Sequence, residues 1–148
     1  EIIISKGQEV HLLIAGEFWE YKGKYDAQIK AAGLEEYVHI FDYFIPDDEA
    51  AAFFEAADLF VAPYTGGTQS GALKAALGLG LPAVITDLIN DPLIEVFHKQ
   101  IKIVPVNNAL YLAEGICEQL PYPKLKKENI DKITKYSWQQ ISKTIISE

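Results

Sequence analysis

Two short apolar runs, residues 58–62 and 83–86, flank a glycine-rich loop and a segment with helical periodicity. This arrangement constrains the fold more than any other feature of the sequence. Both runs have the length and composition of buried strands. Between them, leucine and alanine recur at helical spacing over residues 70–79, Gly80 is placed to end a helix, and Pro82 prevents its continuation. The stretch therefore predicts a strand, a loop, a helix and a second strand.

The start of this predicted helix has the chemistry of an anion site. Four peptide N–H groups would have no partner within the helix that they open, namely those of Gln69, Ser70, Gly71 and Ala72. The helix dipole adds positive potential there, and the nearby glycines let a ligand approach the backbone closely. Phosphate is the expected ligand. The alternative is that the glycines only form a turn and that Ser70 only caps the helix.

The rest of the sequence alternates strand and helix candidates. Further strands are predicted at residues 11–15, 38–41 and 101–104, and further helices at 25–32, 45–57, 91–98, 108–120 and from a capping box at Ser137. Residues 1–10 fit either an edge strand or the end of a helix. Five buried strands alternating with helices predict a doubly wound, Rossmann-like α/β fold with a mostly parallel sheet. In such sheets the ligand lies beyond the carboxyl ends of the strands.

Length and composition predict one domain over residues 1–148, with residues 124–148 as a C-terminal helical extension. The chain has no Met and begins at Glu1, which favours a piece of a longer protein. Its net charge of −8 disfavours nucleic acid and anionic membranes as partners. No apolar run approaches the roughly 18 residues of a membrane span, and the single cysteine cannot form an internal disulfide. A cytoplasmic location is therefore expected.

Neither a metal nor a cofactor is expected. His11, His39 and His98 are separated along the chain, and no Cys, His or carboxylate spacing indicates a metal site. A receiver-like module would need aspartates clustered at strand ends to hold Mg²⁺. Asp58 begins its strand and Asp87 stands alone after another, so no such cluster is visible.

Several motifs occur in a fixed order between residues 10 and 120: LLIAG (12–16), IPD (45–47), ADLFVAPY (57–64), TQSG (68–71), then Ala76, Gly80 and Pro82. Together they resemble the C-terminal, nucleotide-sugar-binding domain of retaining glycosyltransferases with a two-Rossmann-domain architecture, the glycosyl transferases group 1. The resemblance implies a hexosyltransferase-like enzyme of glycan biosynthesis. Such an enzyme transfers a sugar from a nucleotide-sugar donor to an acceptor, with retention at the anomeric carbon.

The resemblance also implies site residues. Backbone amides would bind the donor diphosphate at Thr68, Gln69, Ser70, Gly71 and Ala72, and the pocket for the donor and its base would include Gly16, Phe44, Ile45 and Gly67. Simple core packing explains Phe44 and Ile45 equally well. Many members carry two glutamates near the donor sugar and the ribose, and these positions hold Gly67 and Ala75 here. The identity of the base and of the sugar therefore stays open.

By the same resemblance, an acceptor-binding N-terminal domain, its catalytic residues and a basic first strand would lie upstream of Glu1. No catalytic residue is assigned within residues 1–148, and this chain alone is expected to bind without turnover. The acceptor stays open between a glycan and a lipid-linked sugar. Two alternatives to the glycosyltransferase remain, a nucleotide-sugar epimerase of similar fold and a non-catalytic α/β binding module.

Overall fold

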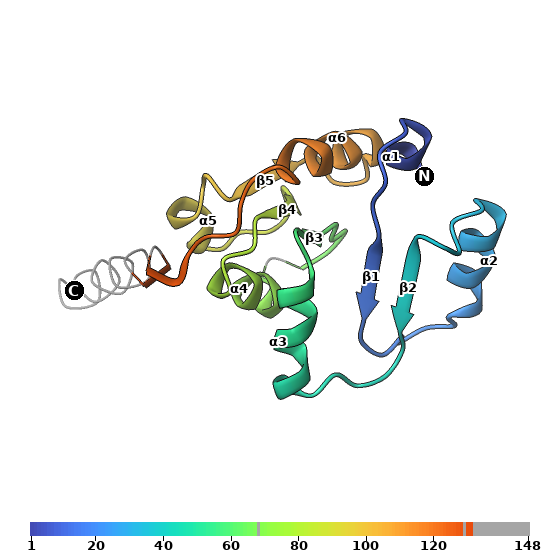
Figure 1. Cartoon of the computed structure of the whole chain (residues 1–148), viewed down its shortest axis with the longest axis horizontal. Coiled ribbons are helices and arrows are strands. Elements are labelled where there is room, and N and C mark those ends of the chain that lie inside the picture. The colour runs from blue at the N-terminus through green and yellow to red at the C-terminus, as the bar shows by residue number, and fades with distance from the viewer. Residues whose placement is uncertain (68, 129, 132–148) are drawn as a thin grey trace. The chain divides into compact units, whose positions relative to one another are not determined.

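The computed structural model describes residues 1–67, 69–128 and 130–131. They divide into two compact units, Glu1–Ala57 and Asp58–Glu148, and each unit is described by itself. Figure 1 labels the elements of both units along the chain. The single domain over residues 1–148 stays a prediction. Within the predicted C-terminal extension, residues 127, 128, 130 and 131 are helical, whereas the capping box at Ser137 lies outside the described residues.

The first unit contains two parallel strands and three helices, in the order α1 Ile2–Ser5, β1 Leu12–Ala15, α2 Gly23–Ala31, β2 Val38–Phe41 and α3 Asp47–Ala56. β1 and β2 pair in parallel with Leu12 opposite Val38. The stretch 1–10, for which the sequence left strand and helix open, contains the single helical turn α1.

Local sequence explains where these elements end. Gly33 has a φ of +64°, and Leu34 N–H donates to Ile29 O at 3.0 Å, which closes α2 with the predicted glycine cap. Phe53 of α3 packs edge-on against Phe41 of β2, with ring centroids 5.0 Å apart. The expectation that β1 is buried is wrong, because Leu12 is 49% exposed. With β2 as its single pairing neighbour among the described strands, β1 lacks the cover of a central strand.

The second unit is a three-layer α/β arrangement, in the order β3 Phe60–Ala62, α4 Gly71–Gly78, β4 Ala83–Thr86, α5 Leu93–Val96, β5 Ile101–Val104 and α6 Ala109–Gln119. The strands are parallel in the order β3–β4–β5, with Phe60 opposite Ala83 and Ala83 opposite Ile101. All four residues of β4 are buried. The predicted strand–loop–helix–strand unit is therefore confirmed.

Consecutive residues of β4 face helices on opposite sides of the sheet. Ile85 belongs to the same buried cluster as Leu73 and Leu77 of α4. Val84, one residue earlier, lies against Gly115 of α6, where an added Cβ would come within 3.3 Å of the Val84 side chain. Helices thus cover both faces of the sheet, as period-two alternation in a buried parallel strand requires.

Gly80 ends α4 and receives a later segment of the chain. Its φ is +81°, and Leu81 N–H donates to Ala76 O at 2.9 Å in the usual glycine-terminated helix end. Leu125 N–H donates to Gly80 O at 2.8 Å, and a Cβ on Gly80 would lie 2.5 Å from Leu125 O. The predicted helix stop is confirmed, and the close approach of residue 125 gives glycine a second reason to be there.

Parallel strands alternating with helices confirm the Rossmann-like α/β class. The single predicted sheet is not observed, since the described strands form two sheets, β1–β2 and β3–β4–β5. Apolar runs locate strands but carry no information on which strands pair, because pairing depends on contacts that are distant in sequence.

Charge is divided unevenly between the two units. Residues 1–57 contain 4 lysines and 12 acidic residues, a net charge of −8, whereas residues 58–148 contain 9 of each and are neutral. The net negative charge of the whole chain therefore resides in the first unit. Within the described ranges, no helix is long and apolar enough to cross a membrane.

Candidate functional site

The N-terminus of α4 presents a set of peptide N–H groups that have no partner among the residues described by the structure. The N-cap Ser70 accepts a hydrogen bond from Leu73 N–H through its Oγ at 3.0 Å, and its carbonyl accepts from Lys74 N–H at 3.3 Å. The peptide N–H groups before that of Leu73 are those of Gln69, Ser70, Gly71 and Ala72. None of these four has a hydrogen-bond acceptor among the described residues. We call these four groups the α4 site. An unsatisfied helix N-terminus of this kind favours an anion.

Space in front of the α4 site is open. A Cβ added to Gly71, or to Gly66 or Gly67 in the preceding loop, would meet no atom of the described residues within 4 Å, apart from chain neighbours and the backbone of α4 itself. Gly67 has a φ of +84°, so the backbone there requires glycine, whereas Gly71 has no positive φ. Thr68, predicted as part of the diphosphate site, lies outside the described residues.

A buried hydroxyl network fixes the loop that leads into α4. Ser70 is 4% exposed, and its Oγ lies 3.0 Å from the Tyr64 hydroxyl. Thr86 Oγ1, at the end of β4, donates to the Tyr64 carbonyl at 2.8 Å. The Ser70 hydroxyl is thus held between Leu73 N–H and the Tyr64 hydroxyl, while its peptide N–H belongs to the α4 site. The prediction that Ser70 caps the helix is confirmed.

Two side chains near the α4 site, Thr86 and Asp91, were missed by sequence reasoning. Thr86 is the single hydroxyl in an otherwise apolar strand, and this polar residue at a strand end was the available signal. Asp91 is the second missed residue. Its Oδ1 accepts from Leu93 N–H at 3.0 Å, and its Oδ2 lies 3.4 Å from Nζ of Lys74 in α4.

The remaining predicted pocket residues belong to the first unit. Gly16 follows β1 with a φ of +137°, and its N–H donates to Phe41 O at 3.1 Å. Phe44 is 70% exposed, so core packing does not explain it, while Ile45 is half-buried. Beside them, desolvation and then a hydrogen bond to the Glu49 carboxylate raise the pKa of Tyr43. That Gly16, Phe44 and Ile45 share a pocket with Gly67 and the α4 site stays a prediction.

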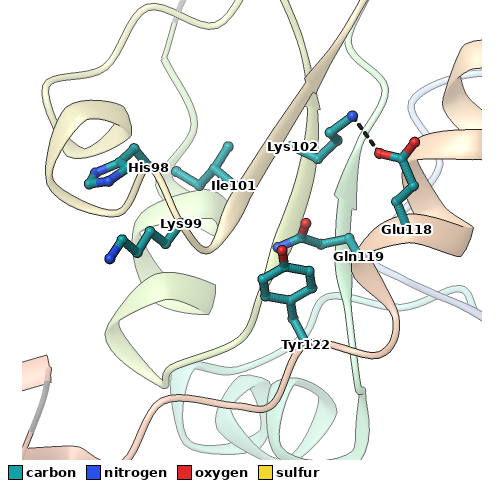
Figure 2. A pocket seen from close by; sticks show the side chains of 7 residues that line it. All are labelled: His98, Lys99, Ile101, Lys102, Glu118, Gln119 and Tyr122. Atoms are coloured by element: carbon teal, nitrogen blue, oxygen red, sulfur yellow. Dashed lines mark hydrogen bonds and ion pairs between the residues drawn. The ribbon is translucent and has the colours of Figure 1, made fainter.

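A hollow of about 660 Å³ lies elsewhere in the second unit (Figure 2) and is lined by His98, Lys99, Ile101, Lys102, Glu118, Gln119 and Tyr122. Lys102 pairs with Glu118, and Gln119 Nε2 donates to Gln100 O at 3.0 Å. This hollow adjoins the amino end of β5, whereas α4 follows the carboxyl end of β3. None of the predicted site residues lines it. Ligands of open parallel sheets bind at the carboxyl end, so the α4 site is the stronger candidate.

Two histidines that are distant in sequence meet in the first unit. His11 Nδ1 and His39 Nε2 are 3.0 Å apart, and the rings stack with centroids 5.2 Å apart. Over the ranges that the structure describes, no three or more His, Cys, Asp or Glu side chains are grouped so that they could hold a metal ion. The expectation of no metal and no cofactor stays a prediction.

Parallel strands alternating with helices define a Rossmann-like α/β protein, and the N-terminus of α4, which follows a strand, is its candidate anion site. The family described as glycosyl transferases group 1 matches residues 1–120, and the chain belongs to this family. The resemblance inferred from the motifs is thereby confirmed.

Among solved structures, the chain is similar to a sucrose-phosphate synthase from Thermosynechococcus elongatus, with a TM-score of 0.69 and 15% sequence identity. The similarity covers 95% of this chain and 39% of that chain. At this identity the likeness shows the fold alone. No curated protein matches the sequence.

Proposed function

We propose that the protein transfers a glycosyl group from a nucleotide-sugar donor to an acceptor, with retention at the anomeric carbon, and that residues 1–148 supply the donor-binding part. Family membership supports glycosyl transfer. The observation that carries the role of this chain is the α4 site, four peptide N–H groups without acceptors among the described residues and with open space in front of Gly71. A diphosphate is the part of such a donor that these groups suit.

The chemistry follows from the charge that develops on the leaving group. When the bond from the sugar to the diphosphate breaks, negative charge grows on the departing phosphate oxygen. Preorganised N–H groups stabilise that charge, and removing one such donor typically costs on the order of 10²-fold in rate or more. The hydrogen bonds of Ser70 to Tyr64 and Leu73 hold the backbone in place before the ligand arrives.

We propose a hexose as the transferred sugar and a glycan or a lipid-linked sugar as the acceptor. No metal or cofactor is invoked. Because the chain corresponds to 39% of the sucrose-phosphate synthase that it matches, the activity of the whole protein is part of the proposal. We expect residues 1–148 alone to bind the donor without turnover.

An NMR titration of the ¹⁵N-labelled chain with UDP, GDP and ADP in parallel tests the donor role. We expect amide shifts at residues 69–72 and a Kd of about 1 mM, or roughly −4 kcal/mol, for the best of the three nucleotides. If residues 69–72 stay unshifted while Lys99 and Lys102 respond, the α4 site is not a diphosphate site and the hollow in Figure 2 takes its place.

Glycosyl transfer itself is tested with the full-length protein. We expect transfer of the sugar to an acceptor, and a product whose anomeric configuration is that of the donor. A full-length protein that only interconverts or hydrolyses nucleotide sugars would contradict the proposal and favour the epimerase alternative.

A further inference from the structure

A buried carboxylate lies beside the first turn of α4. Asp91 follows β4, and its side chain is 2% exposed. Its Oδ1 is hydrogen-bonded to Leu93 N–H at 3.0 Å, whereas its buried Oδ2 has no hydrogen-bond partner among the described residues. The Lys74 ammonium approaches Oδ2 to 3.4 Å, which is an ion-pair distance without hydrogen-bond geometry.

Lys74 is suited to act on the α4 site. It lies one turn after Ser70, whose carbonyl accepts its N–H, and helical side chains lean towards the helix N-terminus. Its side chain is 50% exposed, so the ammonium reaches solvent while one side faces Asp91. An ammonium has three donors, and an ion pair with one carboxylate oxygen leaves others for a ligand.

We infer that Lys74 is a side-chain ligand of the anion at the α4 site and that Asp91 is a positioning residue that holds its ammonium there. This inference rests on the proposed function. A lysine side chain is flexible, and fixing it in the free protein reduces the entropy lost on binding. Burial of Asp91 supports this role, because a carboxylate removed from water strongly favours keeping its cation close.

Asp91 can affect anion affinity in two ways that have opposite signs, by its negative charge and by positioning Lys74. If Asp91 acted only through its charge, neutralising it would remove a repulsion and tighten anion binding. If it positions Lys74, neutralising it weakens binding, and does so only while Lys74 is present. Asp91→Asn suits this comparison, because the amide oxygen can still accept from Leu93 N–H.

The experiment is a double-mutant cycle on the Kd of UDP, measured by NMR titration of the chain. We expect Lys74→Ala to raise Kd roughly five- to tenfold, as for loss of one charge-assisted hydrogen bond at a half-exposed site. Asp91→Asn should raise Kd about threefold alone and have no further effect in the Lys74→Ala background. Lys102→Ala is the matched control, because Lys102 is also half-exposed and paired, with Glu118, but adjoins the amino end of β5.

Each outcome has a distinct meaning. Wild-type protein that does not bind UDP overturns the proposed function. Wild-type binding that Lys74→Ala leaves unchanged overturns this inference alone. An Asp91→Asn effect that is equal in both backgrounds, or a tighter Kd, refutes the positioning role. Lys74→Ala leaves Asp91 buried without a cation, so the double variant, which removes both charges, keeps the role of Lys74 testable if the single variant does not fold.

Discussion

The glycine at position 71 is not required by the backbone conformation, unlike two other glycines around α4. Gly67 and Gly80 have φ angles of +84° and +81°, so the backbone demands glycine at both positions. Gly71 has no positive φ, and an added Cβ would meet no atom within 4 Å. Nothing in the described structure excludes a side chain there. The use of glycine at this position therefore points to something that approaches the helix from outside.

Replacing Gly71 tests this argument directly. We expect Gly71→Val to abolish UDP binding, because a β-branched side chain occupies the space in front of the α4 site, while the fold is kept. The measurement is the same NMR titration. The spectrum of the ligand-free variant should match that of the wild type away from residue 71, which checks that the variant is folded. Gly78→Ala is the control, since Gly78 lies in the same helix and is equally open. Unchanged affinity in Gly71→Val would show that no ligand passes close to this Cα.

At the scale of single residues, the sequence predicts roles that depend on neighbours along the chain. The Ser70 cap and the Gly80 stop are both found, because capping is set within one helical turn. The hydrogen bond of Thr86 to Tyr64 and the ion pair of Asp91 with Lys74 were not predicted. These contacts arise only after β3, β4 and α4 have packed together.

At the scale of elements, α4 and α6 are the helices of the second unit that begin with a side-chain cap among the described residues. Ser70 caps α4, and Asn108 caps α6 by accepting from Tyr111 N–H at 3.1 Å. Ser70→Ala and Asn108→Ala each remove such a cap and should each lower the free energy of unfolding by about 1 kcal/mol. Ser70→Ala should cost somewhat more, because the Tyr64 hydroxyl also loses its partner.

Only one of these two variants should affect the ligand. Because Ser70 fixes the backbone of the α4 site, Ser70→Ala should weaken UDP binding, whereas Asn108→Ala should not. Chemical denaturation gives the stabilities, and the titration gives the affinities. Equal affinities in the two variants would mean that the cap serves only the helix.

Most elements were located from the sequence to within one or two residues. β2, β4 and β5 have the predicted bounds, and α6 differs from its prediction by one residue at each end. Apolar periodicity and capping residues are local signals and give such bounds reliably. Exposure of β1 was not foreseen, because burial of a strand depends on which neighbours it acquires.

At the scale of the whole molecule, the open question is whether Gly16, Phe44 and Ile45 of the first unit take part in donor binding. Pyrophosphate carries the diphosphate without the base. We expect pyrophosphate to shift amides of residues 69–72 alone, and UDP to shift these and also Gly16, Phe44 and Ile45. The measurement compares the amide shifts that pyrophosphate causes with those that UDP causes. If UDP and pyrophosphate shift the same amides, the predicted base pocket is wrong.

The division of the strands into two sheets could not be predicted from the sequence. Five strands were expected in one sheet, and the described strands form a pair and a triplet. Strand direction could be foreseen because each crossover helix makes its two strands parallel. Which strands become neighbours is decided by contacts across the whole chain, and no local pattern encodes them.

The uneven division of charge has a consequence for handling the protein. Adsorption to an amine-bearing resin follows the local density of negative charge, and that density lies in residues 1–57, with 12 acidic residues against 4 lysines. Residues 58–148 carry equal numbers of both signs and offer the resin little net attraction. Such a surface should therefore capture the chain by its first unit, and it should release the chain at an ionic strength set by that unit alone.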